Sequence, residues 1–245
     1  MAHLYQGTLS RVRWFVRRFG AAELVRLPLR ILAAPLILRL LRPGDFMFLG
    51  ERRPYFYHRY NVTWANERCV EVPVARAYLQ QAQGDVLEVG NVLAHYFPLR
   101  HTVLDKFERA PGVVNEDIVN YAPGKKFGLI LSISTFEHIG FDDEGEGGSG
   151  AKIIQAIAAC RRLLAPGGKL VLTVPLGYNP ELDALIEREQ LGSSRACFLK
   201  RVASREWCEV PRMKAIGARF GSPFPFANVV WVAEFESFDA PAART

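Results

Sequence analysis

Short apolar runs recur along the middle and the end of the chain, and polar or glycine-rich stretches separate them. These runs have the length and composition of buried β-strands and lie at residues 86–89, 102–104, 112–117, 127–133, 169–174, 196–202 and 228–235. Apolar spacing and helix-start signals predict helices at residues 73–81, 151–164 and 181–190. Strands that alternate with helices form a mainly parallel sheet with right-handed crossovers. We therefore expect an α/β fold with a mostly parallel, seven-stranded central sheet and an antiparallel last strand.

The stretch from Asp85 to Asp105 has the character of a nucleotide-binding site. Its first strand contains Glu88 and is followed directly by Gly90, and its second strand ends at Asp105. A carboxylate at a strand end suits ribose hydroxyls, and a glycine lets backbone N–H groups approach an anionic part of a ligand. Of a G-x-G-x-x-G dinucleotide loop only Gly90 is present. These residues alone indicate a nucleotide site without fixing the nucleotide.

Polar side chains also follow the other strands of the predicted parallel sheet. Ligands of such sheets bind outside the carboxyl ends of the strands, which share one edge. The candidates at this edge are Glu88, Gly90, Asp105, Asp117, Ser134, Glu137 and His138. Their convergence on one edge is stronger evidence for a site than any single motif.

The first 43 residues differ from the rest of the chain in charge. They hold eight arginines and one acid, whereas the whole chain has a net charge of +6, so the remainder is close to neutral. Residues 9–19 have helical spacing, and residues 29–41 form a second apolar segment that is interrupted by prolines. We expect a basic helical arm with an aromatic linker over residues 1–60 and a catalytic domain over residues 61–245.

The sequence leaves two interpretations of the arm open. In one, a basic amphipathic helix lies on an anionic membrane surface. In the other, the helices pack on the main domain and the arginines face solvent. The membrane would be contacted through four arginines, Arg11, Arg13, Arg17 and Arg18. The longest uncharged run, Ile31 to Leu38, is far shorter than the ~20 residues that span a bilayer.

Two further segments also have two interpretations each. Residues 46–64 are rich in aromatic and basic side chains, which either pack the arm onto the domain or form a flap over the ligand. Residues 141–150 are acidic and glycine-rich, which predicts a loop beside the active edge that is either a lid or simply solvated.

Composition narrows the compartment and the partners. The four cysteines are scattered without a C-x-x-C pair, which favours a reducing, cytoplasmic compartment, at the inner face of a membrane if the arm binds there. No histidine pair has metal-ligand spacing, so we expect no metal site. No nucleic-acid-binding motif accompanies the basic arm, so we expect no nucleic-acid partner. The sequence does not define an oligomeric state.

In order and spacing, several of these stretches resemble the class I S-adenosylmethionine-dependent methyltransferases. The matching stretches are residues 86–90, 103–105, 117, 127–130, 136–139 and 163–170. A helix followed by Pro166-Gly167-Gly168 and then a strand is a hallmark of that family. The resemblance covers about residues 84–176 and implies a Rossmann-like methyltransferase fold with S-adenosyl-L-methionine as the cofactor.

The resemblance also assigns roles to residues. It implies cofactor contacts from Glu88, Gly90, Asn91, Asp105, Asp117, Ile118 and Ser134. Among these, the first loop would lie near the methionyl part, Asp105 would bind the ribose, Asp117 would face the adenine amino group and Ile118 would pack on the ring. The chain departs from the family at Val92 and Ala94, which replace loop glycines, and at Gly128, which replaces an aspartate.

Methyl transfer is an in-line displacement in which the protein mainly aligns donor and nucleophile. A hydroxyl nucleophile must also lose its proton, and His138 is the candidate base, with Glu137 to orient it or to meet the ligand. Tyr178 and Asn179 are candidates for substrate contact. We expect methyl transfer to a small-molecule or glycan/lipid-linked acceptor, with oxygen as the methylated atom.

Two alternatives come from other classes. The lost loop glycines favour a non-catalytic methyltransferase-like module that binds a partner or a membrane through its arm. A nicotinamide-dependent dehydrogenase would share the fold, but it would need the missing G-x-G-x-x-G loop.

Overall fold

The computed structural model describes residues 12–13, 16, 20–42, 44–141 and 149–238. Most of the helix expected at residues 9–19 lies outside this range, and so do Arg11, Arg17 and Arg18. Most of the acidic, glycine-rich loop also lies outside it. Arg13 is described and is exposed.

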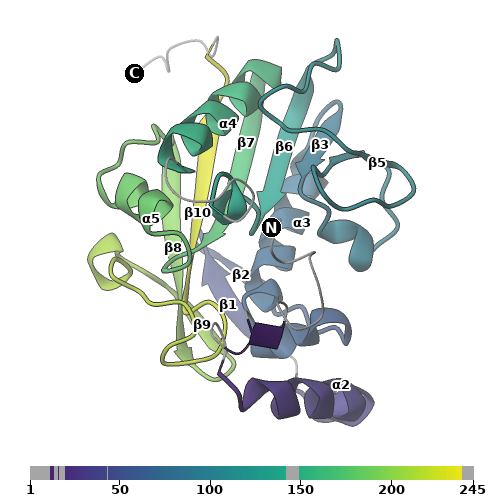
Figure 1. Ribbon diagram of the computed structural model, residues 1–245, viewed down its shortest axis with the longest axis vertical. Coiled ribbons are helices and arrows are strands. Elements are labelled where there is room, and N and C mark those ends of the chain that lie inside the picture. Colours follow the sequence, from purple (N-terminus) through teal and green to yellow (C-terminus); the bar gives the residue numbers. More distant parts are fainter. Residues whose placement is uncertain (1–11, 14–15, 17–19, 43, 142–148, 239–245) are drawn as a thin grey trace.

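An eight-stranded sheet forms the centre of the molecule (Figure 1). Its strands are β3 (Val86–Val89), β4 (Thr102–Leu104), β5 (Val113–Val114), β6 (Phe127–Ile133), β7 (Leu164–Pro175), β8 (Arg195–Ala203), β9 (Glu206–Val210) and β10 (Val229–Glu236). Their order is β5-β4-β3-β6-β7-β10-β8-β9. The strands from β5 to β7 are parallel, and β10 runs antiparallel to both β7 and β8. The expected Rossmann-like arrangement, mostly parallel with an antiparallel strand from the end of the chain, is confirmed.

The sheet has one strand more than the seven expected. Strand β9 pairs antiparallel with β8, and Trp207, at 3% exposed, is its one buried residue. The segment shows no clear alternation, is short and lies directly after β8. It was therefore not separated from the loop that follows β8.

The helices cover both faces of the sheet. The described helices are α2 (Glu23–Leu40), α3 (Arg68–Gln81), α4 (Ser149–Leu163) and α5 (Pro180–Glu187), with 3₁₀ turns η1 (Tyr60–Ala65), η2 (Leu93–His95), η3 (Phe136–His138) and η4 (Arg212–Lys214). Helices α4 and α5 share one core cluster with Ile130 of β6, whereas α3 shares another with Leu129 and Leu131. Successive residues of a strand point to opposite faces, so β6 contributes to both cores.

The aromatic segment begins as a hairpin of β1 (Asp45–Phe48) and β2 (Glu51–Pro54). Phe46 and Phe48 are buried in the same core cluster as α3. This part of the segment is therefore packing, as one of its two interpretations expects.

Helix α3 begins at Arg68, well before Pro73, at which the sequence predicted its start. A proline inside a helix leaves the carbonyl four residues earlier without its usual donor. Here that carbonyl belongs to Cys69, and it accepts a hydrogen bond from the Phe56 N–H at 3.0 Å. The aromatic segment thus supplies the missing donor, and the helix runs through the proline.

The Pro-Gly-Gly turn is part of strand β7, which starts at Leu164 and not at Lys169 as expected. Leu164 pairs with Phe127 and Lys169 pairs with Leu129, so the residues between them bulge out of the register. Gly167 has a positive φ of 73°, which a glycine adopts without strain. The hallmark turn is therefore an irregularity at the edge of the sheet opposite the strand ends that hold the candidate site.

Gly128 marks another close approach. A Cβ atom at this position would lie 1.7 Å from the carbonyl oxygen of Gln83, just before β3. Its N–H donates to the carbonyl of Asp85 at 2.8 Å, so the two chains are fixed side by side. Packing of β6 against the entry to β3 accounts for a glycine where the resembling family has an aspartate.

We therefore expect Gly128→Ala to lower the free energy of unfolding by about 1–3 kcal/mol, because the added methyl group meets backbone and not a movable side chain. Urea denaturation measures this change. Gly150→Ala is the matched control, since its Cβ would meet side-chain atoms only, the nearest being Oε2 of Glu181 at 3.2 Å. Equal stability of Gly128→Ala and the wild type would contradict the proposed approach.

Candidate functional site

A pocket of about 230 Å³ lies at the carboxyl ends of β3, β4, β5 and β6. Strand order reverses at β3, and such a switch point is where open α/β sheets bind ligands. The pocket brings together seven of the predicted site residues, namely Gly90, Asn91, Asp105, Asp117, Ile118, Ser134 and His138. Four others, Glu88, Glu137, Tyr178 and Asn179, do not line it.

Glu88 holds the loop after β3 from beneath. Its side chain is fully buried, and its Oε1 accepts hydrogen bonds from the N–H groups of Val92 at 2.9 Å and Leu93 at 2.8 Å. Its Oε2 lies 2.8 Å from Nε2 of His101. A buried carboxylate needs such partners, and with them Glu88 shapes the loop.

The loop does not need the glycines that the resembling family has there. Val92 has φ −107° and ψ −49°, an ordinary conformation for any residue, and it leads into the η2 turn. Leu93 is fully buried in the core. The loop therefore accommodates Val92 and Ala94 and is held by hydrogen bonds to Glu88.

Gly90 is the one position of the loop that requires a glycine. Its φ is 91°, and a Cβ there would lie 2.1 Å from Oγ1 of Thr135, which follows β6. Its N–H donates to the carbonyl of Leu104 at 2.8 Å. The glycine thus lets the loops after β3 and β6 meet at the pocket wall.

Asp105 at the end of β4 ties the next loop together. Its Oδ1 accepts from the N–H groups of Phe107 at 2.8 Å and Glu108 at 2.7 Å, and its Oδ2 accepts from Asn91 N–H at 3.0 Å. Asn91 in turn donates through Nδ2 to Glu108 Oε1 at 2.7 Å, while its buried Oδ1 has no partner among the described residues. Two carboxylates therefore line the pocket here, beside one buried acceptor atom that is unused among the described residues.

The backbone donors of this loop are already used. The N–H groups of Gly90, Asn91, Val92 and Leu93 donate to Leu104, Asp105 and Glu88 inside the protein. The sequence predicted that they would approach an anionic part of the ligand. The structure corrects this, because carboxylates and a carbonyl have taken these donors.

Asp117 lies at the far end of the pocket between two lysines. Its Oδ2 is 3.1 Å from Lys106 Nζ and 3.3 Å from Lys152 Nζ, and its Oδ1 accepts from Val119 N–H at 3.1 Å. Burial acts to raise the pKa of Asp117, but the hydrogen bonds and the two ammonium groups lower it below its usual value. Ile118 is buried beside it as an apolar wall.

The hydroxyl of Ser134 points away from the ligand side. It donates to Glu71 Oε1 at 2.7 Å, and Thr173 Oγ1 donates to the same oxygen at 2.8 Å. Arg68 pairs with the other oxygen of Glu71. Ser134 also has a φ of 40°, so the chain turns sharply after β6. The hydroxyl of Ser134 is therefore used in the hydrogen bond to Glu71 beneath the pocket.

His138 is the histidine of the η3 turn, and it lines the pocket with about a third of its side chain exposed. Its Nε2 lies 3.7 Å from Oε1 of Glu137, and its ring meets the Tyr178 ring edge-on at 4.8 Å. Glu137 is 2% exposed, and its Oε2 is buried without a partner among the described residues. Burial raises the pKa of Glu137 to about 8, although the neighbouring His138 opposes this shift.

Tyr178 contacts the His138 ring, and Asn179 hydrogen-bonds the backbone of the η3 turn that carries His138. Asn179 is 1% exposed; its Oδ1 accepts from Glu181 and Leu182 N–H at the start of α5, and its Nδ2 donates to the carbonyl of Glu137 at 3.0 Å. Tyr178 is 6% exposed. The structure thus gives Asn179 a helix-capping position and buries Tyr178, so neither presents a surface to the pocket.

Several residues that line the pocket were not among the predicted site residues. Among them are Lys106, Phe107, Glu108, Glu116, Thr135 and Ile139. Glu108 could have been found as a second acid three residues after Asp105. Thr135 could not, because its contact with Gly90 depends on how two separate loops meet.

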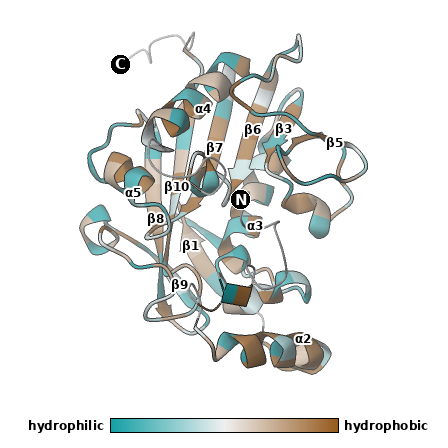
Figure 2. Ribbon diagram, in the orientation of Figure 1, coloured by the Kyte–Doolittle hydropathy of each residue, from teal (hydrophilic) through white to brown (hydrophobic). Residues whose placement is uncertain are grey.

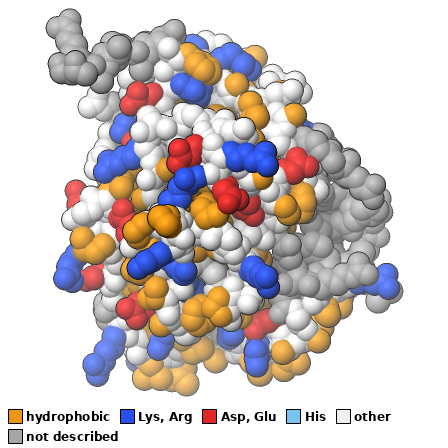
Figure 3. Space-filling view, turned by 90° about the vertical axis from the view of Figure 1, so that its left-hand side faces the viewer, with side chains coloured by type: hydrophobic (Ala, Val, Ile, Leu, Met, Phe, Trp, Pro, Cys, Tyr) orange, Lys and Arg blue, Asp and Glu red, His pale blue; other side chains and the backbone are white. Residues whose placement is uncertain are grey.

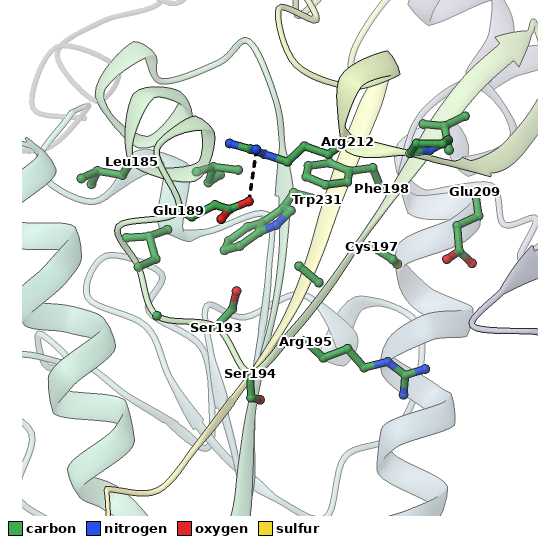
Figure 4. Close-up of a pocket in the computed structure, with 16 residues that line it drawn as sticks. Leu185, Glu189, Ser193, Ser194, Arg195, Cys197, Phe198, Glu209, Arg212 and Trp231 are labelled. Carbon is green, nitrogen blue, oxygen red and sulfur yellow. Dashed lines mark ion pairs between the residues drawn. The ribbon is translucent and has the colours of Figure 1, made fainter.

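A larger groove than this pocket lies elsewhere (Figure 4). It has a volume of about 870 Å³ and lies between α5 and the first half of β8, with Phe198 and Trp231 at its base. Arg212 spans it to Glu189 at 3.1 Å. None of the predicted site residues lines it, and it is away from the strand ends that gather the acids. We therefore place the candidate site in the smaller pocket.

Among the described residues, no group of three or more His, Cys, Asp or Glu side chains is arranged to hold a metal ion. All four cysteines are free.

Comparison with known proteins returned matches among solved structures only. No family model matches the chain, and no curated protein does. The N-methyltransferase NodS from Bradyrhizobium japonicum WM9, solved with S-adenosyl-L-homocysteine, is 16% identical over 69% of this chain and 86% of its own, with a TM-score of 0.42. A TehB-like S-adenosylmethionine-dependent methyltransferase from Corynebacterium glutamicum is 18% identical over 66% and 86%, with a TM-score of 0.39. The glycopeptide N-methyltransferase MtfA, solved with S-adenosyl-L-methionine, is 16% identical over 68% and 94%, with a TM-score of 0.35.

The raised pKa of Glu137 makes a testable difference to stability. The folded chain keeps the Glu137 proton up to about pH 8, whereas an unfolded chain releases it near 4.5. The stability that depends on this proton is therefore complete below pH 4.5 and is lost as the pH rises through 8. We expect Glu137→Gln to remove this loss, so that its free energy of unfolding declines less than that of the wild type across this interval.

Urea denaturation at a series of pH values measures the two slopes. The exposed Glu206→Gln on β9 is the matched control, and its slope should follow the wild type. Parallel slopes for Glu137→Gln and the wild type would show that the Glu137 carboxyl titrates normally.

Proposed function

We propose that this protein transfers the methyl group of S-adenosyl-L-methionine to a hydroxyl group of a small-molecule or glycan/lipid-linked acceptor. One observation carries the proposal. The pocket at the switch point of the sheet offers carboxylates for a nucleoside, while the first loop has no backbone donor left over from Gly90 to Leu93. A ligand with ribose and base but no phosphate suits this combination.

The same observation disfavours a nicotinamide dinucleotide. Dinucleotide sites hold a pyrophosphate on free N–H groups of the first loop and the following helix. Here those donors are taken by Glu88, Asp105 and the Leu104 carbonyl, and two acids, Glu88 and Asp105, lie where a pyrophosphate would add further negative charge.

The residues that are present fit S-adenosyl-L-methionine. Asp105 and Glu108 would accept hydrogen bonds from the ribose hydroxyls, and Asp117 from the adenine amino group, with Ile118 against the ring. The partnerless Oδ1 of Asn91 would accept from the ammonium of the methionyl part. When bound, the cofactor supplies a methyl group already activated on a sulfonium.

In this proposal, His138 takes the proton of the acceptor hydroxyl. It lies at the end of the pocket formed by the η3 turn, and the edge-on Tyr178 ring and the Asn179 bond to η3 fix its position. Glu137 carries a proton at neutral pH because of its raised pKa, so its own carboxyl is neutral beside the imidazole. Transfer then needs alignment of the hydroxyl oxygen with the methyl carbon and removal of one proton.

A non-catalytic module is the second candidate, since the first loop departs from the family. The loop geometry weakens it, because Val92 occupies a conformation that needs no glycine. We also propose a cytoplasmic site of action, which the scattered cysteines of the sequence favour.

Titration calorimetry with S-adenosyl-L-methionine tests the cofactor. The wild type should bind it and should not bind NAD, and Asp105→Ala should weaken binding at least tenfold through the loss of a charged hydrogen-bond acceptor. Asp85→Ala is the matched control, because Asp85 lies before β3 at the opposite edge and pairs only with Lys125 among the described residues. Absence of binding by the wild type would overturn the proposal.

His138→Ala tests the base. With a labelled cofactor and a panel of sugar, polyol and amine acceptors, we expect kcat for hydroxyl acceptors to fall by roughly 10²–10⁴ while the cofactor Kd is unchanged. Equal kcat values for the two proteins would exclude His138 as the base. Methyl transfer to amines alone would replace oxygen with nitrogen as the methylated atom, and transfer to any acceptor would exclude a non-catalytic module.

A further inference from the structure

Helix α2 carries apolar side chains on two faces, one packed on the rest of the protein and one exposed. Glu23, its single acid, is 2% exposed and pairs with Arg30 at 2.8 Å on the inner side. Ala34 on the same side is buried against Val62 and Trp64 of the η1 turn. The inner face of α2 is therefore already occupied by the rest of the protein.

The outward face is a broad aliphatic surface. Its exposed members are Leu24, Val25, Leu29, Ile31, Leu32, Leu36 and Leu40, which we call the α2 outer face. Leu32 is 78% exposed and Leu40 is 72% exposed. Figure 2 shows α2 at the lower end of the molecule with many hydrophobic residues, and in Figure 3 hydrophobic side chains lie along that lower edge with lysine or arginine side chains near them. A surface of this kind marks an interaction site.

The charges around the outer face are positive. Arg26, Arg39 and Arg42 are exposed at the two ends of the helix. The one acid of the helix, Glu23, is buried; it pairs with Arg30 and lies 3.6 Å from Arg26. It therefore offsets part of the charge at that end of the helix and none at the end that carries Arg39 and Arg42. An apolar face bordered by arginines complements a surface that is apolar within and anionic at its boundary, and an anionic lipid surface has this composition.

A second copy of the chain fits less well. Helices that pair with each other bury a narrow stripe and place polar residues beside it. The α2 outer face instead spans about half of the helix circumference, with Pro28 and Pro35 exposed between its leucines. Within the described part of the chain, no helix could cross a bilayer. These features suit a helix that lies in the membrane interface.

We propose that the α2 outer face docks on an anionic membrane surface, with its leucines among the acyl chains and Arg26, Arg39 and Arg42 at the headgroups. This contact differs from the one expected of Arg11, Arg13, Arg17 and Arg18, because aliphatic side chains of α2 carry it. In Figure 1, β6 runs with its carboxyl end toward the half of the molecule in which α2 lies. Docking would thus turn the edge with the candidate site toward the lipid, which suits the lipid-linked acceptors of the proposed function.

Co-sedimentation of the full chain with vesicles tests the proposal. The wild type should sediment with vesicles of phosphatidylcholine and phosphatidylglycerol, and less with phosphatidylcholine alone. Leu29→Ser/Leu32→Ser/Leu36→Ser should bind at least about tenfold more weakly. Arg39→Glu/Arg42→Glu should lose the preference for anionic vesicles.

Ile154→Ser is the matched control, because Ile154 is an exposed aliphatic residue of α4, far from α2 (Figure 1). It should bind as the wild type does. Circular dichroism and cofactor titration of the same preparations show that each variant is folded, and they separate this result from the catalytic proposal. Failure of the wild type to sediment with anionic vesicles would overturn docking, as would unchanged binding by the triple variant. A wild-type dimer that the triple variant loses, with no vesicle binding by either, would assign the face to a second copy.

Discussion

The buried carboxylate of Glu88 is the constraint on which the candidate site depends. A fully buried charge is tolerated only with hydrogen-bond partners, and Glu88 finds them in Val92, Leu93 and His101. The hydrogen bonds from Val92 and Leu93 to Glu88 fold the loop after β3 over this carboxylate. That fold brings Asn91 to Asp105 and Gly90 against Thr135, so three strand ends share one wall. Glu88 thus shapes the pocket although it is fully buried and does not line it.

Glu71 repeats this principle at the ends of the next two strands, β6 and β7. Its carboxylate is fully buried in α3 and accepts hydrogen bonds from Ser134 after β6 and from Thr173 of β7, while Arg68 balances its charge. The two acids therefore fix the carboxyl ends of neighbouring strands. Glu137 differs, because burial without such partners favours its protonated form.

The sequence predicted the sheet well because buried strands are continuous apolar runs, and runs such as 127–133 are local. It also predicted which side chains share the ligand edge, since topology follows from alternation. It could not distinguish an acid that faces the ligand from one that holds a loop. Glu88 contacts His101, and Asn179 donates to the carbonyl of Glu137; a single-sequence pattern carries no record of these two distant partners. The outward apolar face of α2 was hidden for the same reason, since only packing decides which face is covered.

Strand β5 is the edge strand of the sheet beside the pocket, and it is only two residues long. A free strand edge presents unpaired N–H and C=O groups to which a strand of another molecule can add. Here the chain leaves the edge at once, because Asn115 donates to the carbonyls of Asp105 and Glu108. So short an edge offers little template for edge-to-edge aggregation.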